Sequence, residues 1–143
     1  MKLLMTEDGA TFEGRYYRLE NASYRPRPVQ KPHLPIWIGA SGEQLMLPIV
    51  GRHADVWHGF GSVEELVRKG AIVDRAAEEA GRDPSTIERS SALSLSEPWD
   101  EVRRTIAGLR EAGFSYLTVS WPSEGKPRLD EFVADVMPEF SAD

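Results

Sequence analysis

A glycine-rich turn is the first stretch of this 143-residue chain whose residue types could do chemistry. Its members are Gly39, Ala40, Ser41, Gly42 and Glu43. An apolar run ends at Ile38, a helical pattern follows from Glu43 to His53, and a second apolar run begins at Ala54. In such a strand–turn–helix–strand unit, free backbone N–H groups and the positive end of a helix dipole meet at the turn. The turn is therefore predicted to bind an anion.

The same turn also has a purely structural interpretation. Ser41 precedes Gln44 by three residues, the spacing of a capping box, so its hydroxyl could simply cap the following helix. Gly39 and Gly42 could simply turn the chain, and a lone Gly-x-x-Gly pair is weak evidence for a phosphate site. The two interpretations are compatible, because a capped helix end still has N–H groups to offer.

The carboxyl end of the second apolar run carries Trp57 and His58. A histidine there could act as a general acid or base, or could donate a hydrogen bond to a carbonyl group, and a packed or solvated role is equally consistent. His58 is the one candidate catalytic residue. Strand alternation puts Asp55 and Trp57 on one face and Val56 on the other. We interpret Asp55 as a structural group that pairs with Arg52 or caps backbone N–H groups.

Several kinds of chemistry lack their residues. The chain has no cysteine, hence no thiolate and no disulfide, and it has no Gly-x-Ser-x-Gly motif. His53 and His58 lie across a helix–strand boundary and are expected to diverge, so no metal site is predicted. Trp37 and Trp121 are interpreted as core residues rather than as surfaces for a ligand ring.

Charge and hydropathy narrow the partners. The chain has 17 Lys and Arg against 23 Asp and Glu, a net charge of −6, which argues against nucleic acid or an anionic membrane as the main partner. No apolar run approaches the roughly 20 residues of a membrane-spanning helix. We expect a cytoplasmic protein whose partners are small molecules or proteins.

From residue 35 onward the pattern alternates between strands and helices. Four short apolar runs, rich in β-branched or aromatic residues, are predicted as strands: Pro35–Gly39, Ala54–Phe60, Ser90–Leu95 and Tyr116–Trp121. A helix is predicted after each one. Such alternation predicts parallel pairing with right-handed crossovers, and therefore an α/β fold.

Local signals mark the ends of these helices. The first is predicted to start at Ser41, and the second at Ser62, which forms a capping box with Glu65 and leads to a stop at Gly81. A short extra turn is predicted at Asp83-Pro84 and a third helix over 99–112. The fourth helix is predicted from an apolar stripe at helical spacing: Leu129, Phe132, Val133, Val136, Met137 and Phe140.

The first third of the chain has a different character. Residues 1–5 resemble the end of a helix, and Thr11–Leu19 is predicted as a hairpin in which Gly14 supplies a turn conformation that a residue with a Cβ would resist. Four prolines make Tyr24–Pro35 a stiff connector. We predict one domain over 1–143, with the helix end, hairpin and connector in 1–33 and four βα units in 34–143.

Four βα units are half of an eight-unit barrel, which typically takes about 250 residues. The pattern therefore permits two architectures. One is an open parallel sheet, and the other is a half-barrel whose edge strands need a partner.

Ordered motifs along nearly the whole chain resemble the luciferase-like monooxygenases, and within them the enzymes that use a deazaflavin coenzyme. The matching segments are Phe12–Tyr17, Pro26–Pro32, Pro35–Glu43, Ala54–Trp57, Glu79–Pro84 and Glu111–Phe114. Each motif is weak by itself, whereas their order and spacing are fairly specific. Family members usually have a small residue where Val56 stands, and often Asn where His58 stands.

The resemblance implies a TIM-type (β/α)8 barrel of which this chain matches the carboxyl-terminal half, so that Met1 corresponds to an internal position. It also implies that the turn after the first predicted strand approaches the phosphate end of the cofactor. Coenzyme F420, a deazaflavin, is the expected cofactor and FMN the alternative. Gly39, Ala40, Ser41, Gly42, Glu43 and Trp57 are the expected binding residues.

The sequence thus predicts the carboxyl-terminal part of a flavin- or deazaflavin-dependent oxidoreductase that acts on a small organic substrate. The isolated chain is expected to be a homo-oligomer or to lack an amino-terminal half. The alternative is a non-catalytic α/β domain that binds a phosphorylated ligand or pairs with a partner chain through its open sheet edges.

Overall fold

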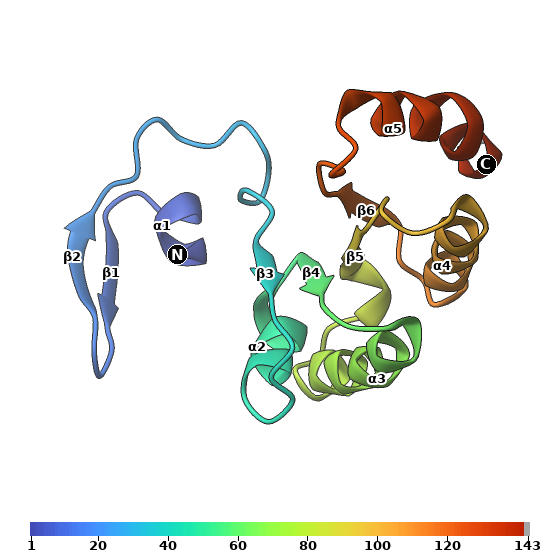
Figure 1. Ribbon diagram of the computed structural model, residues 1–143. Helices are drawn as coiled ribbons and strands as arrows, with labels where there is room; N and C mark the ends of the chain where they lie inside the picture. The colour runs from blue at the N-terminus through green and yellow to red at the C-terminus, as the bar shows by residue number, and fades with distance from the viewer. Residues whose placement is uncertain (142–143) are drawn as a thin grey trace. The chain divides into compact units, whose positions relative to one another are not determined.

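The computed structural model describes residues 1–141 and divides at Pro35 into two compact units. The first unit is Met1–Pro35, and the second begins at Ile36 (Figure 1). The boundary coincides with the end of the predicted connector, Tyr24–Pro35. The candidate site lies within the second unit.

The first unit contains a short helix and the predicted hairpin. Helix α1 is Lys2–Thr6, and strands β1 (Ala10–Glu13) and β2 (Arg18–Ala22) pair antiparallel. The proposed role of Gly14 is wrong, because Gly14 does not have a positive φ. A Cβ at Gly14 would lie 2.6 Å from the ring of the half-exposed Phe12, which would have to move aside.

The second unit is built on a four-stranded parallel sheet, as predicted. Its strands are β3 (Trp37–Gly39), β4 (Val56–Gly59), β5 (Glu88–Leu93) and β6 (Tyr116–Val119). They lie side by side in chain order, β3-β4-β5-β6, and all three neighbouring pairs are parallel. Consecutive βα units in spatial order are the arrangement of a (β/α)8 barrel, and here four of them form an unclosed segment.

A helix follows each strand of the sheet, and the predicted end signals of α3 are confirmed. The helices are α2 (Met46–His53), α3 (Val63–Glu79), α4 (Trp99–Glu111) and α5 (Lys126–Glu131). Ser62 and Glu65 form the reciprocal capping box, and Gly81 beyond the end of α3 has a φ of +71°. Asp83 caps the short turn η1 (Pro84–Thr86).

The predicted start of the first helix is wrong. Helix α2 begins at Met46, and its N-cap residue Leu45 makes no side-chain capping bond, so Ser41 and Gln44 form no capping box. Pro48 gives the physical reason, because proline fits only in the first turn of a helix. A helix that began at Ser41 would hold Pro48 in its interior.

The last predicted helix is broken into three pieces. After α5 the chain forms a wide turn, η2 (Phe132–Val136), and then a 3₁₀ turn, η3 (Met137–Phe140). Pro138 lacks an N–H and would clash with the carbonyl four residues earlier in a regular helix. The apolar stripe is therefore only partly buried: Phe132 and Val136 are in the core, whereas Val133 and Met137 are 49% and 46% exposed.

Two buried clusters join the sheet to its helices. The larger contains Trp57, Leu47, Val50, Leu66 and Val73 among its members, and the smaller contains Leu93, Val102, Ile106, Phe132 and Val136. The core assignments of Trp37 and Trp121 are wrong, since these side chains are 47% and 68% exposed. Ile38 packs against the larger cluster, so alternation turns its neighbour Trp37 to the other face of the sheet.

Candidate functional site

One row of residues crosses all four strands on the sheet face opposite the helices, which we call the open face. Strand register aligns Gly39 with His58, His58 with Ser90, and Ser90 with Tyr116. Trp37 lies on the same face, and its ring meets Tyr116 edge-on with centroids 5.1 Å apart. Because parallel strands end at one edge, the row lies near the loops that follow β3 and β4.

The loop after β3 is attached to β4 at its base. The N–H of Ala40 donates to the His58 carbonyl at 3.2 Å. The Ala40 carbonyl in turn accepts from the indole Nε1 of Trp57 at 3.0 Å. Two consecutive residues of β4 thus hold Ala40 from both sides, while Ser41 and Gly42 beyond it are exposed.

The rest of this loop offers hydrogen-bond donors. Within residues 1–141, the N–H groups of Ser41, Gly42 and Glu43 have no hydrogen-bond partner. The Glu43 carboxylate accepts from Nη1 of Arg68 on α3 at 2.7 Å. Exposed N–H groups beside an arginine can hold a phosphate, although Glu43 competes for the same guanidinium.

Trp57 serves the loop from inside the core. Its side chain is fully buried, and its ring lies 5.7 Å from Phe114 on the helix-covered face. Asp55 shares that face, as predicted, and accepts the N–H of Ile36 at 2.8 Å. This bond confirms the predicted role of Asp55 as a cap for backbone N–H groups.

His58 lies half-buried on the open face. Its Nδ1 is 2.9 Å from Oγ of Ser90, and its ring meets Phe60 edge-on with centroids 4.9 Å apart. Ser90 is fully buried. Sequence reasoning missed Ser90 and Phe60, since only the strand register shows which residue of β5 faces His58.

Two cations on α3 were also missed. Arg68 reaches the loop after β3, and Lys69, only 8% exposed, donates from Nζ to the Phe60 carbonyl at 2.9 Å. A signal for them existed, because the Ser62 capping box fixes the start of α3 and therefore puts residues 68 and 69 two turns from the carboxyl edge of β4.

Aromatic rings give the open face flat apolar surfaces. Trp37, Phe60 and Tyr116 are 47%, 48% and 47% exposed. Rings of this kind pack well against a planar ligand, and a donor beside them can select a polar group on it.

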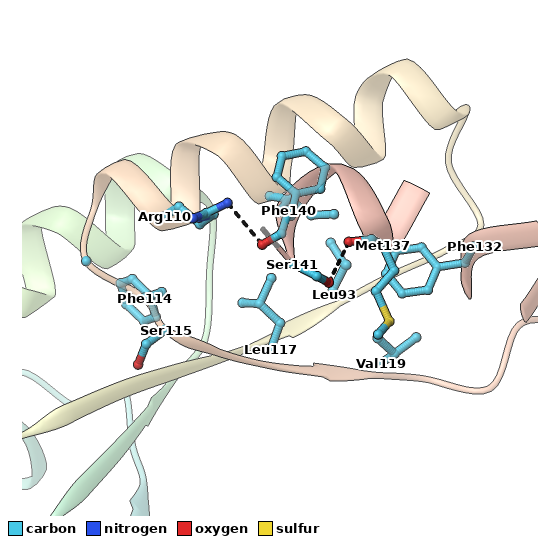
Figure 2. Close-up of a pocket in the computed structure, with 12 residues that line it drawn as sticks. Leu93, Arg110, Phe114, Ser115, Leu117, Val119, Phe132, Met137, Phe140 and Ser141 are labelled. Carbon is cyan, nitrogen blue, oxygen red and sulfur yellow. Dashed lines mark hydrogen bonds between the residues drawn. The ribbon is translucent and has the colours of Figure 1, made fainter. Parts of the chain in front are cut away.

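A separate cavity of about 620 Å³ lies on the helix-covered face (Figure 2). The side chains of Leu117 and Val119 from β6 point toward Met137 and Phe140, and Arg110 donates to the Phe140 carbonyl at 3.1 Å. The cavity lining contains none of the residues 39–43 and does not contain His58. It therefore plays no part in the candidate site.

No three His, Asp or Glu side chains in residues 1–141 converge as a metal ion would require. No helix of that range is long and apolar enough to cross a membrane.

Consecutive parallel βα units define the class of (β/α)8-type folds. A sequence model described as luciferase-like monooxygenase matches residues 1–97. The chain therefore belongs to the luciferase-like monooxygenase family.

Three similar proteins illustrate the relationship. The chain is 29% identical over 114 residues to an F420-dependent glucose-6-phosphate dehydrogenase of Segniliparus rotundus, covering 73% of this chain and 32% of that protein. The structure of the coenzyme F420 dependent tetrahydromethanopterin reductase from Methanopyrus kandleri superposes with a TM-score of 0.81 at 15% identity, covering 97% of this chain and 60% of that one. The structure of a riboflavin lyase with modified FMN and substrate riboflavin superposes with a TM-score of 0.70 at 13% identity. This match covers 91% of this chain and 47% of that one.

The two structural matches establish the fold. Curated mycobacterial relatives are 33% identical to this chain over 57 residues, and the chain covers 20% of their length. It covers 32% of the length of the glucose-6-phosphate dehydrogenase. The chain therefore spans only a part of the length of these relatives.

Proposed function

We propose that this chain is the carboxyl-terminal part of a deazaflavin- or flavin-dependent oxidoreductase that acts on a small organic substrate, and that the loop Gly39–Glu43 binds the phosphate end of the cofactor. The observation that carries the proposal is the set of N–H groups at Ser41, Gly42 and Glu43 without a protein partner, on a loop fixed to β4 through Ala40. Family membership supports the reaction class.

The open surroundings of the loop support the proposed phosphate role. A Cβ at Gly42 would find only Met46 within van der Waals distance, at 3.7 Å, so the present glycine leaves the backbone accessible. Arg68 supplies a cation within reach of the loop. Trp57 contributes indirectly, since its indole holds the Ala40 carbonyl and so turns the Ser41 N–H, on the opposite side of the same peptide unit, away from the indole.

When bound, F420 would supply hydride transfer, and reduced FMN would supply oxygen activation. The chain's own residues would bind and orient the cofactor. Coenzyme F420 is the favoured cofactor, because the Segniliparus relative and the Methanopyrus reductase are both F420-dependent. FMN is the alternative, since the riboflavin lyase structure contains a modified form of it.

A comparison of FMN with riboflavin tests the phosphate role, because the two differ only in the phosphate. We expect weak binding of FMN by the isolated chain, weaker binding of riboflavin, and amide resonance shifts concentrated at residues 39–43. Gly42→Ala is expected to reduce the preference for FMN while leaving the thermal unfolding temperature unchanged. Turnover by the isolated chain at about 1 per second or more would refute an incomplete site.

Arg82→Gln is the matched control, because Arg82 donates to the Gly51 and Ala54 carbonyls and does not touch the loop. This variant should lose some stability and keep the preference for FMN. Equal affinity for FMN and riboflavin in the parent chain would overturn the phosphate assignment.

A further inference from the structure

We propose that Ser90 is a positioning residue that holds the hydrogen of neutral His58 on Nε2, so that His58 presents an N–H donor to a ligand oxygen at the open face. The donation from His58 to a ligand oxygen rests on the proposed function. The tautomer is a property of the free chain and is tested without a ligand.

The register of the sheet brings His58 and Ser90 together. His58 and Ser90 are paired residues of β4 and β5, 32 positions apart in the chain. Their side chains leave the same face side by side, which brings Nδ1 and Oγ to 2.9 Å. This contact follows from the pairing of the strands, so it is held by the backbone of both.

The hydroxyl hydrogen of Ser90 and the imidazole hydrogen of His58 are both satisfied in only one arrangement. Ser90 is fully buried, and within residues 1–141 its hydroxyl has His58 as its single hydrogen-bond partner. If Nδ1 carried the hydrogen, it would donate to Oγ and leave the hydroxyl hydrogen buried without an acceptor, which costs free energy. If Ser90 donates to Nδ1, both groups are satisfied, and the imidazole hydrogen must be on Nε2.

The Nε2 atom of His58 has no hydrogen-bond partner among the described residues, and the ring is half-buried rather than enclosed. The next residue of the row is Gly39, and the ring of Phe60 lies 3.5 Å from the position that a Cβ at Gly39 would take. Exposed aromatic surface of Phe60 and Tyr116 borders the same face. A planar ring that carries a carbonyl oxygen suits this combination.

The Nε2–H tautomer leaves His58 one of its two candidate roles. A neutral imidazole with Nε2–H cannot accept a proton at Nε2, so His58 does not act there as a general base. It acts as a hydrogen-bond donor that orients or polarises an oxygen atom. The specificity is for an oxygen acceptor over an N–H donor at that position of the ligand.

Nitrogen-15 NMR of the histidine rings in the ligand-free chain tests the proposal at a pH where His58 is neutral. We expect a protonated Nε2 and an unprotonated, hydrogen-bonded Nδ1. Ser90→Ala should lower the ratio of the Nε2–H to the Nδ1–H form by about fivefold, the effect of one lost hydrogen bond. A parent chain with Nδ1–H would overturn the proposal by itself, whether or not the variant folds.

Ser91→Ala is the matched control. Ser91 is the next residue of β5, is 3% exposed, and donates to the Gly59 carbonyl at 3.1 Å on the opposite side of the strand. This variant loses a buried hydroxyl and a hydrogen bond but should keep the tautomer of His58. An equal effect of both substitutions would show a general loss of structure and overturn the specific role of Ser90. Failure of the FMN preference would refute the proposed function and leave the tautomer result standing.

Discussion

At the scale of single residues, the candidate loop combines attraction and repulsion for an anion. Ser41 and Gly42 offer exposed N–H groups, whereas Glu43 adds a carboxylate that occupies Arg68. Both partners of this ion pair are substantially exposed, with side chains 56% and 40% accessible, so the pair is worth little in stability. Its effect on ligand binding is the more informative quantity.

Glu43→Gln is expected to tighten the binding of FMN by up to about fivefold, because it frees Arg68 and removes a negative charge beside the phosphate. Fluorescence titration at low ionic strength measures the change. Glu111→Gln, which makes the same charge change at the end of α4, should leave the affinity as it is. Weaker binding in the Glu43 variant would contradict the assignment of the phosphate to this loop.

At the scale of elements, the contact of α2 with α3 shapes the helix layer below the loop. Gly51 of α2 lies against the backbone of α3, where an added Cβ would be 2.4 Å from the Val73 carbonyl oxygen and 2.8 Å from the Ala76 Cβ. Backbone atoms cannot give way as a flexible side chain can. Glycine is therefore required for the two helices to approach.

Gly51→Ala is expected to destabilise the chain by about 1–3 kcal/mol, the cost of overpacking a close contact. Chemical denaturation measures the free energy of unfolding. Gly108→Ala is the control, because Gly108 lies inside α4 and its added Cβ would meet Val63 at an ordinary 3.4 Å. That variant should gain stability by about 0.5–1 kcal/mol, the usual advantage of alanine in a helix.

The turn η3 is attached to α4 through a carboxylate, which makes this attachment dependent on pH. Arg103 donates to Glu139 through Nε and Nη2, and this hydrogen bonding lowers the pKa of Glu139 below its ordinary value and raises that of Arg103. A carboxyl group with a lowered pKa in the folded state stabilises that state above the ordinary pKa of Glu, about 4.3, and loses this effect as pH falls through the lowered value.

Glu139→Gln is therefore expected to lower the unfolding temperature at pH 7 and to have a vanishing effect at strongly acidic pH. Calorimetry of both proteins over a series of pH values measures the difference. A gap between the two proteins that persists in acid would show that Glu139 acts through packing rather than through its charge.

At the scale of the whole molecule, the second unit presents two sheet edges. Among the described residues, neither β3 nor β6 has a second strand neighbour in the sheet. Unpaired edges bind other strands, and Val119 adds exposed apolar surface to the edge strand β6. The isolated chain is thus expected to associate through its edges.

Sedimentation velocity should show self-association that increases with protein concentration. Val119→Lys is expected to reduce it, because a charge on an edge strand opposes pairing. Val67→Lys makes the same change at a side chain on α3 that is 52% exposed and should have little effect. A parent chain that remains monomeric at all concentrations would instead favour a self-sufficient open sheet.

Local signals predicted much of the architecture. The Ser62–Glu65 capping box, Gly81 and Asp83 mark their elements correctly, because capping depends on residues within one turn of each other. The predictions for the first and last helices failed where proline opposed the local pattern. Pro48 and Pro138 remove hydrogen bonds that a regular helix needs, and both are visible in the sequence.

The sequence by itself determined the order of strands and helices, the parallel sheet and the position of the glycine-rich loop, because each depends on residues close together in the chain. The tertiary structure decided which side chains lie on each face of the sheet and which of them meet. It put Trp57 in the core beneath the loop, left Trp37 on the open face, and joined His58 to Ser90 across 32 positions. Strand register fixes such contacts, and register depends on how whole strands pair across the sheet.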